Sequence, residues 1–147
     1  MKRAACLLLA VLFLLLAGCK ADLSAYADTP ITVTGLTDEP FTVTPAELAQ
    51  LKCVDAKARG NSDKAGTVRA HGPLLSALAE AHGRSLDEFY YVRFAASDGY
   101  DVTISALIWD SYDVILSISN GSEPLAERQR PLRIVIPAMT PANGCGS

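Results

Sequence analysis

Several signatures of catalysis and of nucleic-acid binding are missing from this chain of 147 residues. It has no glycine-rich phosphate loop, no G-x-S-x-G nucleophile motif and no H-E-x-x-H zinc motif, so sequence evidence for those three chemistries is lacking. It has only two histidines, and its carboxylates lack the spacing of a calcium loop. No run of Lys and Arg is long enough to indicate nucleic-acid binding, and we expect none.

Long apolar runs are also scarce. The longest, Leu7 to Leu16, is too short for a transmembrane helix, which needs about 20 residues. A Lys-Arg pair precedes it and Leu-Ala-Gly-Cys ends it, which is the layout of a secretory signal. The cysteine directly after Leu-Ala-Gly resembles the lipobox of bacterial lipoproteins, in which diacylglycerol alkylates the thiol before cleavage. We therefore predict a signal peptide at 1–18, a lipid anchor on Cys19, and a place in the bacterial cell envelope outside the cytoplasm.

The alternative is an ordinary signal peptide in which the cysteine stands by chance. Loss of residues 1–18 removes two basic residues and no acidic one, which leaves 11 basic and 16 acidic side chains and a net charge of −5. Of the four cysteines, Cys6 leaves with the signal and Cys19 carries the lipid. Cys53 and Cys145 then lie in an oxidising compartment, where they either form a disulfide or stay as two thiols.

The mature chain, about 129 residues, suits one domain. We predict a lipidated tether at 19–30 and the domain at 31–147. Apolar and polar residues alternate with period two, as in half-buried strands, in several short segments. Two brief helices are expected, one capped by Thr44-Pro45-Ala46-Glu47 and one beginning at Pro73. Because strands outnumber short interspersed helices, the predicted class is α+β with mixed sheets.

Six segments carry a family resemblance: I-T-V-T-G-L at 31–36, F-T-V-T-P-A-E-L at 41–48, H-G-P-L-L-S-A-L at 71–78, V-R-F-A-A-S-D-G-Y at 92–100, N-G-S-E-P-L at 120–125 and P-L-R-I-V-I-P at 131–137. In this order and spacing they resemble the molybdopterin-binding domain of the sulfite-oxidase-like oxidoreductases. The resemblance implies a mixed α+β fold, a pterin dithiolene cofactor, and molybdenum bound through one protein cysteine.

The chain departs from that family at the metal ligand. An ungapped extension of the resemblance puts the ligand position at Ser62, where a soft thiolate is required. Cys53 lies nine residues earlier, and using it as the ligand would leave too few residues for the strand that carries the ligand. The segment 137–147 also has no Lys, Arg or Trp, whereas the family continues there with basic and aromatic residues around the pterin phosphate.

The candidate residues for a cofactor or anion site are Arg69, His71, Arg133 and Ser62. The resemblance implies His71, Arg133 and Ser62, whereas Arg69 is only nearby in the sequence. The alternatives are surface ion pairs for the two arginines and an exposed loop position for His71. We therefore predict a non-catalytic domain that needs no cofactor and binds a small anionic ligand or a protein partner. The alternative function is a molybdopterin-dependent oxidoreductase in which Cys53 binds the molybdenum.

Overall fold

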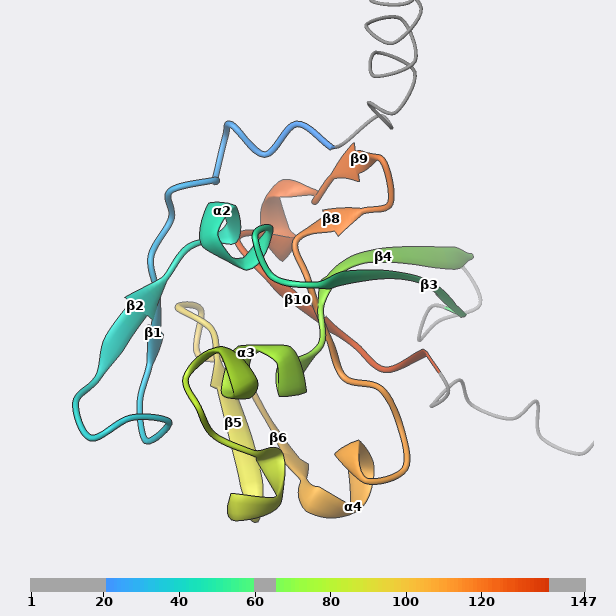
Figure 1. The fold of residues 1–147 in the computed structure, drawn as a ribbon. Coiled ribbons are helices and arrows are strands. Elements are labelled where there is room, and N and C mark those ends of the chain that lie inside the picture. The colour runs from blue at the N-terminus through green and yellow to red at the C-terminus, as the bar shows by residue number, and fades with distance from the viewer. Residues whose placement is uncertain (1–20, 60–65, 138–147) are drawn as a thin grey trace, which may run out of the picture.

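The computed structural model describes residues 21–59 and 66–137. Within them the strands form antiparallel units joined by short helices, so the α+β class is confirmed (Figure 1). The paired strands are β1 (Ile31–Val33) with β2 (Phe41–Val43), β3 (Cys53–Arg59) with β4 (Thr67–Pro73), β5 (Tyr91–Ala95) with β6 (Asp101–Ser105), and β7 (Ile115–Ser117) with β10 (Arg133–Val135). Two short strands, β8 (Ser119–Asn120) and β9 (Glu123–Pro124), extend the β3–β4 sheet.

Helix α2 (Pro45–Leu48) begins as the sequence predicts. The Thr44 hydroxyl accepts a hydrogen bond from the Glu47 N–H at 3.2 Å, and the Glu47 carboxylate accepts one from the Thr44 N–H at 2.8 Å. This reciprocal capping box satisfies two backbone donors at the helix start. The same device, with Ser85 and Glu88, begins the 3-10 turn η1 (Leu86–Glu88).

The start of the second helix was predicted two residues too early. Pro73 ends β4 and is buried, and α3 (Leu75–Ala81) begins after Leu74. Leu74 stays extended because it forms an antiparallel bridge with Ile115 of β7. Pairing with a distant strand therefore overrides the preference of proline for a first helical turn.

Strand β4 crosses β7 at very close range. A β-carbon built on Gly72 would lie 2.0 Å from the carbonyl oxygen of Leu116. The apolar face of the β3–β4 hairpin packs on β7 and β10 around Ala70, Ile115 and Val135. A larger core is formed by α2, α3 and β7 together with the β1–β2 and β5–β6 hairpins. The close crossing therefore links the hairpin to the rest of the domain.

The first described residues also belong to the folded domain. Tyr26 is only 3% exposed, and its hydroxyl donates to the Ile118 carbonyl at 2.8 Å and accepts from the Leu125 N–H at 2.9 Å. The segment expected as a tether therefore contributes a core side chain ahead of residue 31.

The remaining elements are α4 (Ala106–Trp109) and the 3-10 turn η2 (Glu127–Gln129). The Asp98-Gly99 turn joins β5 to β6 and the Asn120-Gly121 turn joins β8 to β9. No helix in the described part of the chain is long and apolar enough to cross a membrane.

Candidate functional site

A polar surface covers one face of the β3–β4 hairpin. The register pairs Asp55 with His71 and Lys57 with Arg69. Because successive side chains of a strand point to opposite faces, these four lie together on the side turned away from Ala56 and Ala70. We call these four residues and the neighbouring Arg133 the hairpin site.

The imidazole of His71 is fixed by Asp55. Its Nδ1 lies 2.9 Å from the Asp55 Oδ1, and the side chain of His71 is 34% exposed. A carboxylate only accepts hydrogen bonds, so the His71 Nδ1–H donates to Asp55. His71 thus lies on a strand rather than in the exposed loop that was the alternative expectation.

Lys57 and Arg69 stand directly opposite each other with like charges. Like charges at opposed positions destabilise a sheet, by an amount in the range of roughly 0.2–1 kcal/mol for such pairs. Within the described segments no carboxylate lies within 4.0 Å of either cation. Among the described residues the positive charge of the pair is therefore not compensated by an ion pair.

The backbone of Arg69 is held by two side chains from distant parts of the sequence. Its N–H donates to the Asn120 Oδ1 at 3.2 Å, and its carbonyl accepts from the Arg133 Nη2 at 2.8 Å. The aliphatic part of Arg69 lies over Gly121, where an added β-carbon would be 3.3 Å from its Cδ. These contacts fix where the Arg69 side chain leaves the sheet.

Arg133 is a partly buried cation. Burial lowers the pKa of its guanidinium from the ordinary value. Its Nε is buried with no hydrogen-bond partner in the described part of the molecule, and no carboxylate there forms an ion pair with it. A charge removed from water without a counter-charge is costly, so an anion near this guanidinium would be stabilised.

The structure thus brings Arg69, His71 and Arg133 into one neighbourhood. Of the other sequence-predicted positions, Ser62, Cys19 and Cys145 lie outside the described residues. Sequence reasoning missed Asp55, Lys57 and Asn120. The first two had a signal, because the alternation in C-V-D-A-K-A-R already placed them on one face of a strand.

Cys53 occupies the other end of the hairpin. It stands across from Pro73, and its Sγ lies 3.9 Å from the Leu48 carbonyl. Four residues of strand, roughly 13 Å, separate it from Lys57, the position opposite Arg69. No group of three or more metal-ligating side chains forms among the residues that the structure describes.

No protein-family model matches the chain, and no curated protein is significantly similar to it. The resemblance to the sulfite-oxidase-like oxidoreductases therefore stays a prediction from the sequence.

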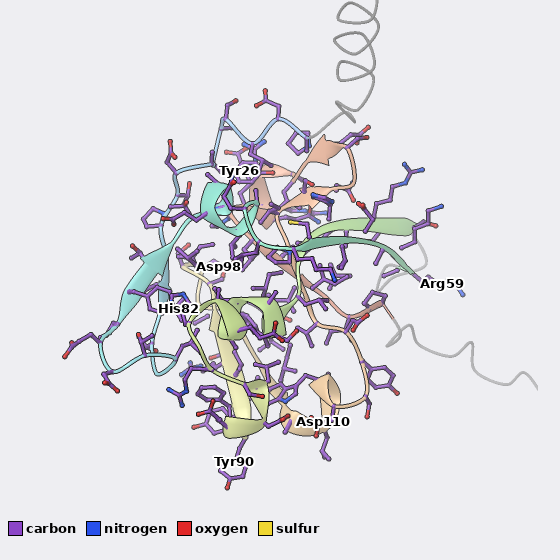
Figure 2. All side chains as sticks on the ribbon, in the orientation of Figure 1. Tyr26, Arg59, His82, Tyr90, Asp98 and Asp110 are labelled. Carbon is purple, nitrogen blue, oxygen red and sulfur yellow. The ribbon has the colours of Figure 1, made fainter. Side chains whose placement is uncertain are left out.

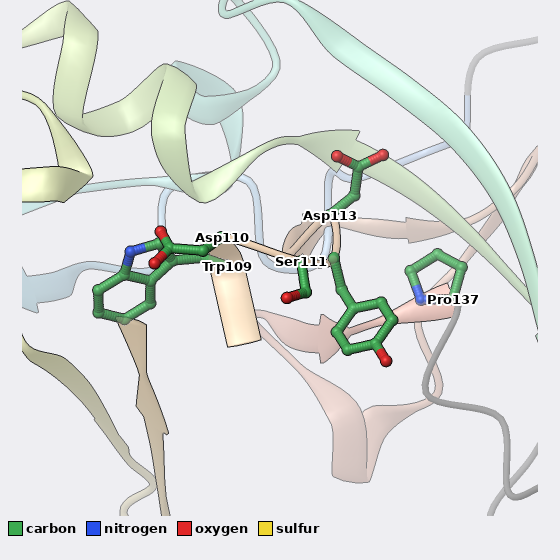
Figure 3. A pocket seen from close by; sticks show the side chains of 6 residues that line it. Trp109, Asp110, Ser111, Asp113 and Pro137 are labelled. Carbon is green, nitrogen blue, oxygen red and sulfur yellow. The ribbon is translucent and has the colours of Figure 1, made fainter. Parts of the chain in front are cut away.

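A separate hollow of about 360 Å³ lies where α4 leads into β7. Figure 3 shows Trp109 and Pro137 at its two sides with Ser111 between them. Asp110, Tyr112 and Asp113 complete the lining. None of the hairpin-site residues lines this hollow, and its two carboxylates are exposed to solvent.

Proposed function

We propose that the protein is a membrane-anchored lipoprotein outside the cytoplasm whose domain has the sulfite-oxidase-like molybdopterin-binding fold. Its proposed role is to bind a small anionic ligand at the hairpin site without catalysing a reaction. A protein partner with an acidic surface is the second kind of ligand that this site suits. The observation that carries the proposal is the Lys57–Arg69 pair, which has no carboxylate within ion-pair distance among the described residues, together with the contact of Arg133 with the Arg69 carbonyl.

Two features favour an anion here. The mature chain has a net charge of −5, so an uncompensated cationic cluster is unusual against the charge of the whole molecule. Arginine presents several N–H donors in a planar fork that fits carboxylate and phosphate groups. Asp55, a carboxylate on the same face of the hairpin, is already bonded to His71. An oxyanion between Lys57 and Arg69 would supply the missing counter-charge.

A catalytic role receives less support. The family chemistry that the resemblance implies requires a thiolate ligand, and the matching position holds Ser62. Cys53, the alternative ligand, lies at the other end of β3 from the Lys57–Arg69 pair. The proposal therefore keeps the molybdopterin-type fold and leaves out the molybdenum.

The proposal predicts weak, salt-sensitive binding of inorganic phosphate. Titration of the purified domain followed by backbone amide NMR should move the resonances of β3 and β4. Arg69→Gln should weaken binding at least about tenfold, because a lost charge-assisted hydrogen bond costs about 1.5–3 kcal/mol.

The matched control is Arg93→Gln, because Arg93 lies on the exposed face of β5 and pairs with Asp101. This variant should bind phosphate like the wild type. Equal loss of binding in both variants, or shifts spread over the whole surface, would contradict a specific hairpin site.

A further inference from the structure

The chain enters the folded domain beside Tyr26. Leu23 packs against the main core, the Ala46 N–H donates to the Ala27 carbonyl at 3.0 Å, and the Tyr26 hydroxyl bridges Ile118 and Leu125. The guanidinium of Arg130 also stacks over the Tyr26 ring, 5.0 Å from its centroid. The position of the chain is therefore fixed from Leu23 onward.

Little chain lies between this point and the expected lipid. Cys19 comes four residues before Leu23, and an extended chain spans at most about 3.3–3.6 Å per residue, or about 14 Å here. A domain of this size is roughly 30 Å across. A connecting segment shorter than half that width does not allow the far end of the domain to reach the membrane.

The surface around the entry point is polar. It is formed by exposed residues on both sides of Tyr26, and we call it the membrane-side face: Asp22, Ser24, Asp28, Glu123, Glu127 and Arg128. Hydrogen bonds from Ser24 lower the pKa of Asp22, so this carboxylate is ionised at neutral pH. The large exposed hydrophobic residues of the described chain all fall between Tyr90 and Tyr112. The membrane-side face carries four carboxylates and one arginine, so it does not suit insertion among acyl chains, and the short connection to Cys19 is what brings it to the headgroups.

The opposite end of the molecule carries exposed apolar side chains. Figure 2 shows Tyr26 at one end and Tyr90 and Asp110 at the other. Tyr90 is 87% exposed and Leu107 79% exposed. They are neighbours, because the Ala106 N–H donates to the Tyr90 carbonyl at 2.9 Å.

We propose that the membrane-side face rests against the headgroups of the bilayer, and that the end with Tyr90 and α4 points into the aqueous compartment. This inference rests on the proposed lipid on Cys19. The partner that it assigns to the membrane-side face is a lipid surface, and it leaves the apolar end accessible to other molecules.

The sole tryptophan, Trp109, lies in α4 and is a built-in depth probe. Processed protein is reconstituted in phosphatidylcholine vesicles that carry bromine near the headgroup end of the acyl chains, since bromine quenches tryptophan at short range. Wild-type fluorescence should be unchanged by the bromine. Ser24→Trp in a Trp109→Phe background should lose most of its fluorescence, and the matched control Tyr90→Trp in that background should lose none. If Trp109→Phe does not fold, Ser24→Trp alone should lose only the fluorescence added by the new tryptophan.

Two results would overturn the orientation: quenching of Trp109 or of the Tyr90→Trp variant, or no quenching of the Ser24→Trp variant while the protein sediments with the vesicles. If the processed protein fails to sediment and behaves like Cys19→Ala, the lipid proposal itself is wrong and the orientation is overturned with it. The sedimentation measurement therefore separates the two failures.

Discussion

Tyr26 shows how much a single side chain contributes ahead of the first strand. Its ring is buried and its hydroxyl satisfies one backbone acceptor and one backbone donor at the β8–β9 end. Buried backbone groups are nearly always paired, and an orphaned one is costly. The side chain thus closes the end of the fold where the chain enters.

Tyr26→Phe keeps the ring and removes only the hydroxyl. The free energy of unfolding should fall by about 1–3 kcal/mol, because the Leu125 N–H and the Ile118 carbonyl lose their partner. Urea denaturation followed by circular dichroism measures the change. The control, Tyr90→Phe, is at a position 87% exposed and should stay within about 0.5 kcal/mol of wild type. Equal effects at the two positions would contradict this role for Tyr26.

Individual site residues could be predicted from the sequence only in part. The family resemblance pointed to His71 and Arg133, and Arg69 was a candidate because it is near His71 in the sequence; the structure places these three near one another. The resemblance did not indicate that Asp55 binds the His71 ring or that Asn120 binds the backbone of Arg69. Those contacts depend on strand register and on a turn 51 residues away, which local patterns do not specify.

At the scale of elements, local sequence patterns predicted the secondary structure correctly where a local interaction determines it. The capping box at Thr44 predicted where α2 begins. The period-two alternation of Cys53–Arg59 matches the residues of β3. Pro73 misled, because the bridge between Leu74 and Ile115 extends the chain. The pairing of β10 with β7 and of β8 with β4 joins distant segments, so periodicity within one segment cannot reveal it.

Gly72 is the position at which two elements depend on the absence of a side chain. Gly72→Ala would put a methyl group 2.0 Å from the Leu116 carbonyl oxygen, so β4 and β7 would have to separate. We expect a loss of at least about 3 kcal/mol of unfolding free energy, or no folding, since overpacking against backbone cannot be relieved by a rotamer change.

Thermal denaturation of Gly72→Ala beside Gly83→Ala would measure this effect. Gly83 has a positive φ of 70° but open space around its added β-carbon, so only local backbone strain, about 1–3 kcal/mol, is expected there. A Gly72→Ala protein as stable as the Gly83→Ala protein would show that the crossing can relax.

A molybdenum centre would be a property of the whole molecule. The resemblance implies a thiolate ligand at position 62 and basic residues after residue 137 that hold the pterin phosphate. The chain has a serine at position 62, and residues 138–147 include no Lys or Arg. These two departures are far apart in the sequence and point to the same conclusion. The non-catalytic proposal follows from their combination more than from either alone.

Protein purified from a host that makes molybdopterin should therefore contain no stoichiometric molybdenum. Elemental analysis of the wild type beside Cys53→Ser tests this, and both samples should give the same background. Near-stoichiometric metal in the wild type together with its loss in Cys53→Ser would make Cys53 the ligand and restore the oxidoreductase alternative.

The Tyr26 hydroxyl is bonded to Ile118, which lies 92 positions later in the chain, and to Leu125, which lies 99 positions later. This separation affects the order of folding. If the chain is exported from its N-terminus as proposed, Tyr26 would leave the translocation channel long before Ile118 and Leu125. Loop-closure entropy makes contacts of such long range late and slow to form. On this proposed route the domain would complete its fold only after nearly all of the chain has been secreted. Until then the tyrosine nearest the expected lipid stays accessible, so its burial marks the end of maturation.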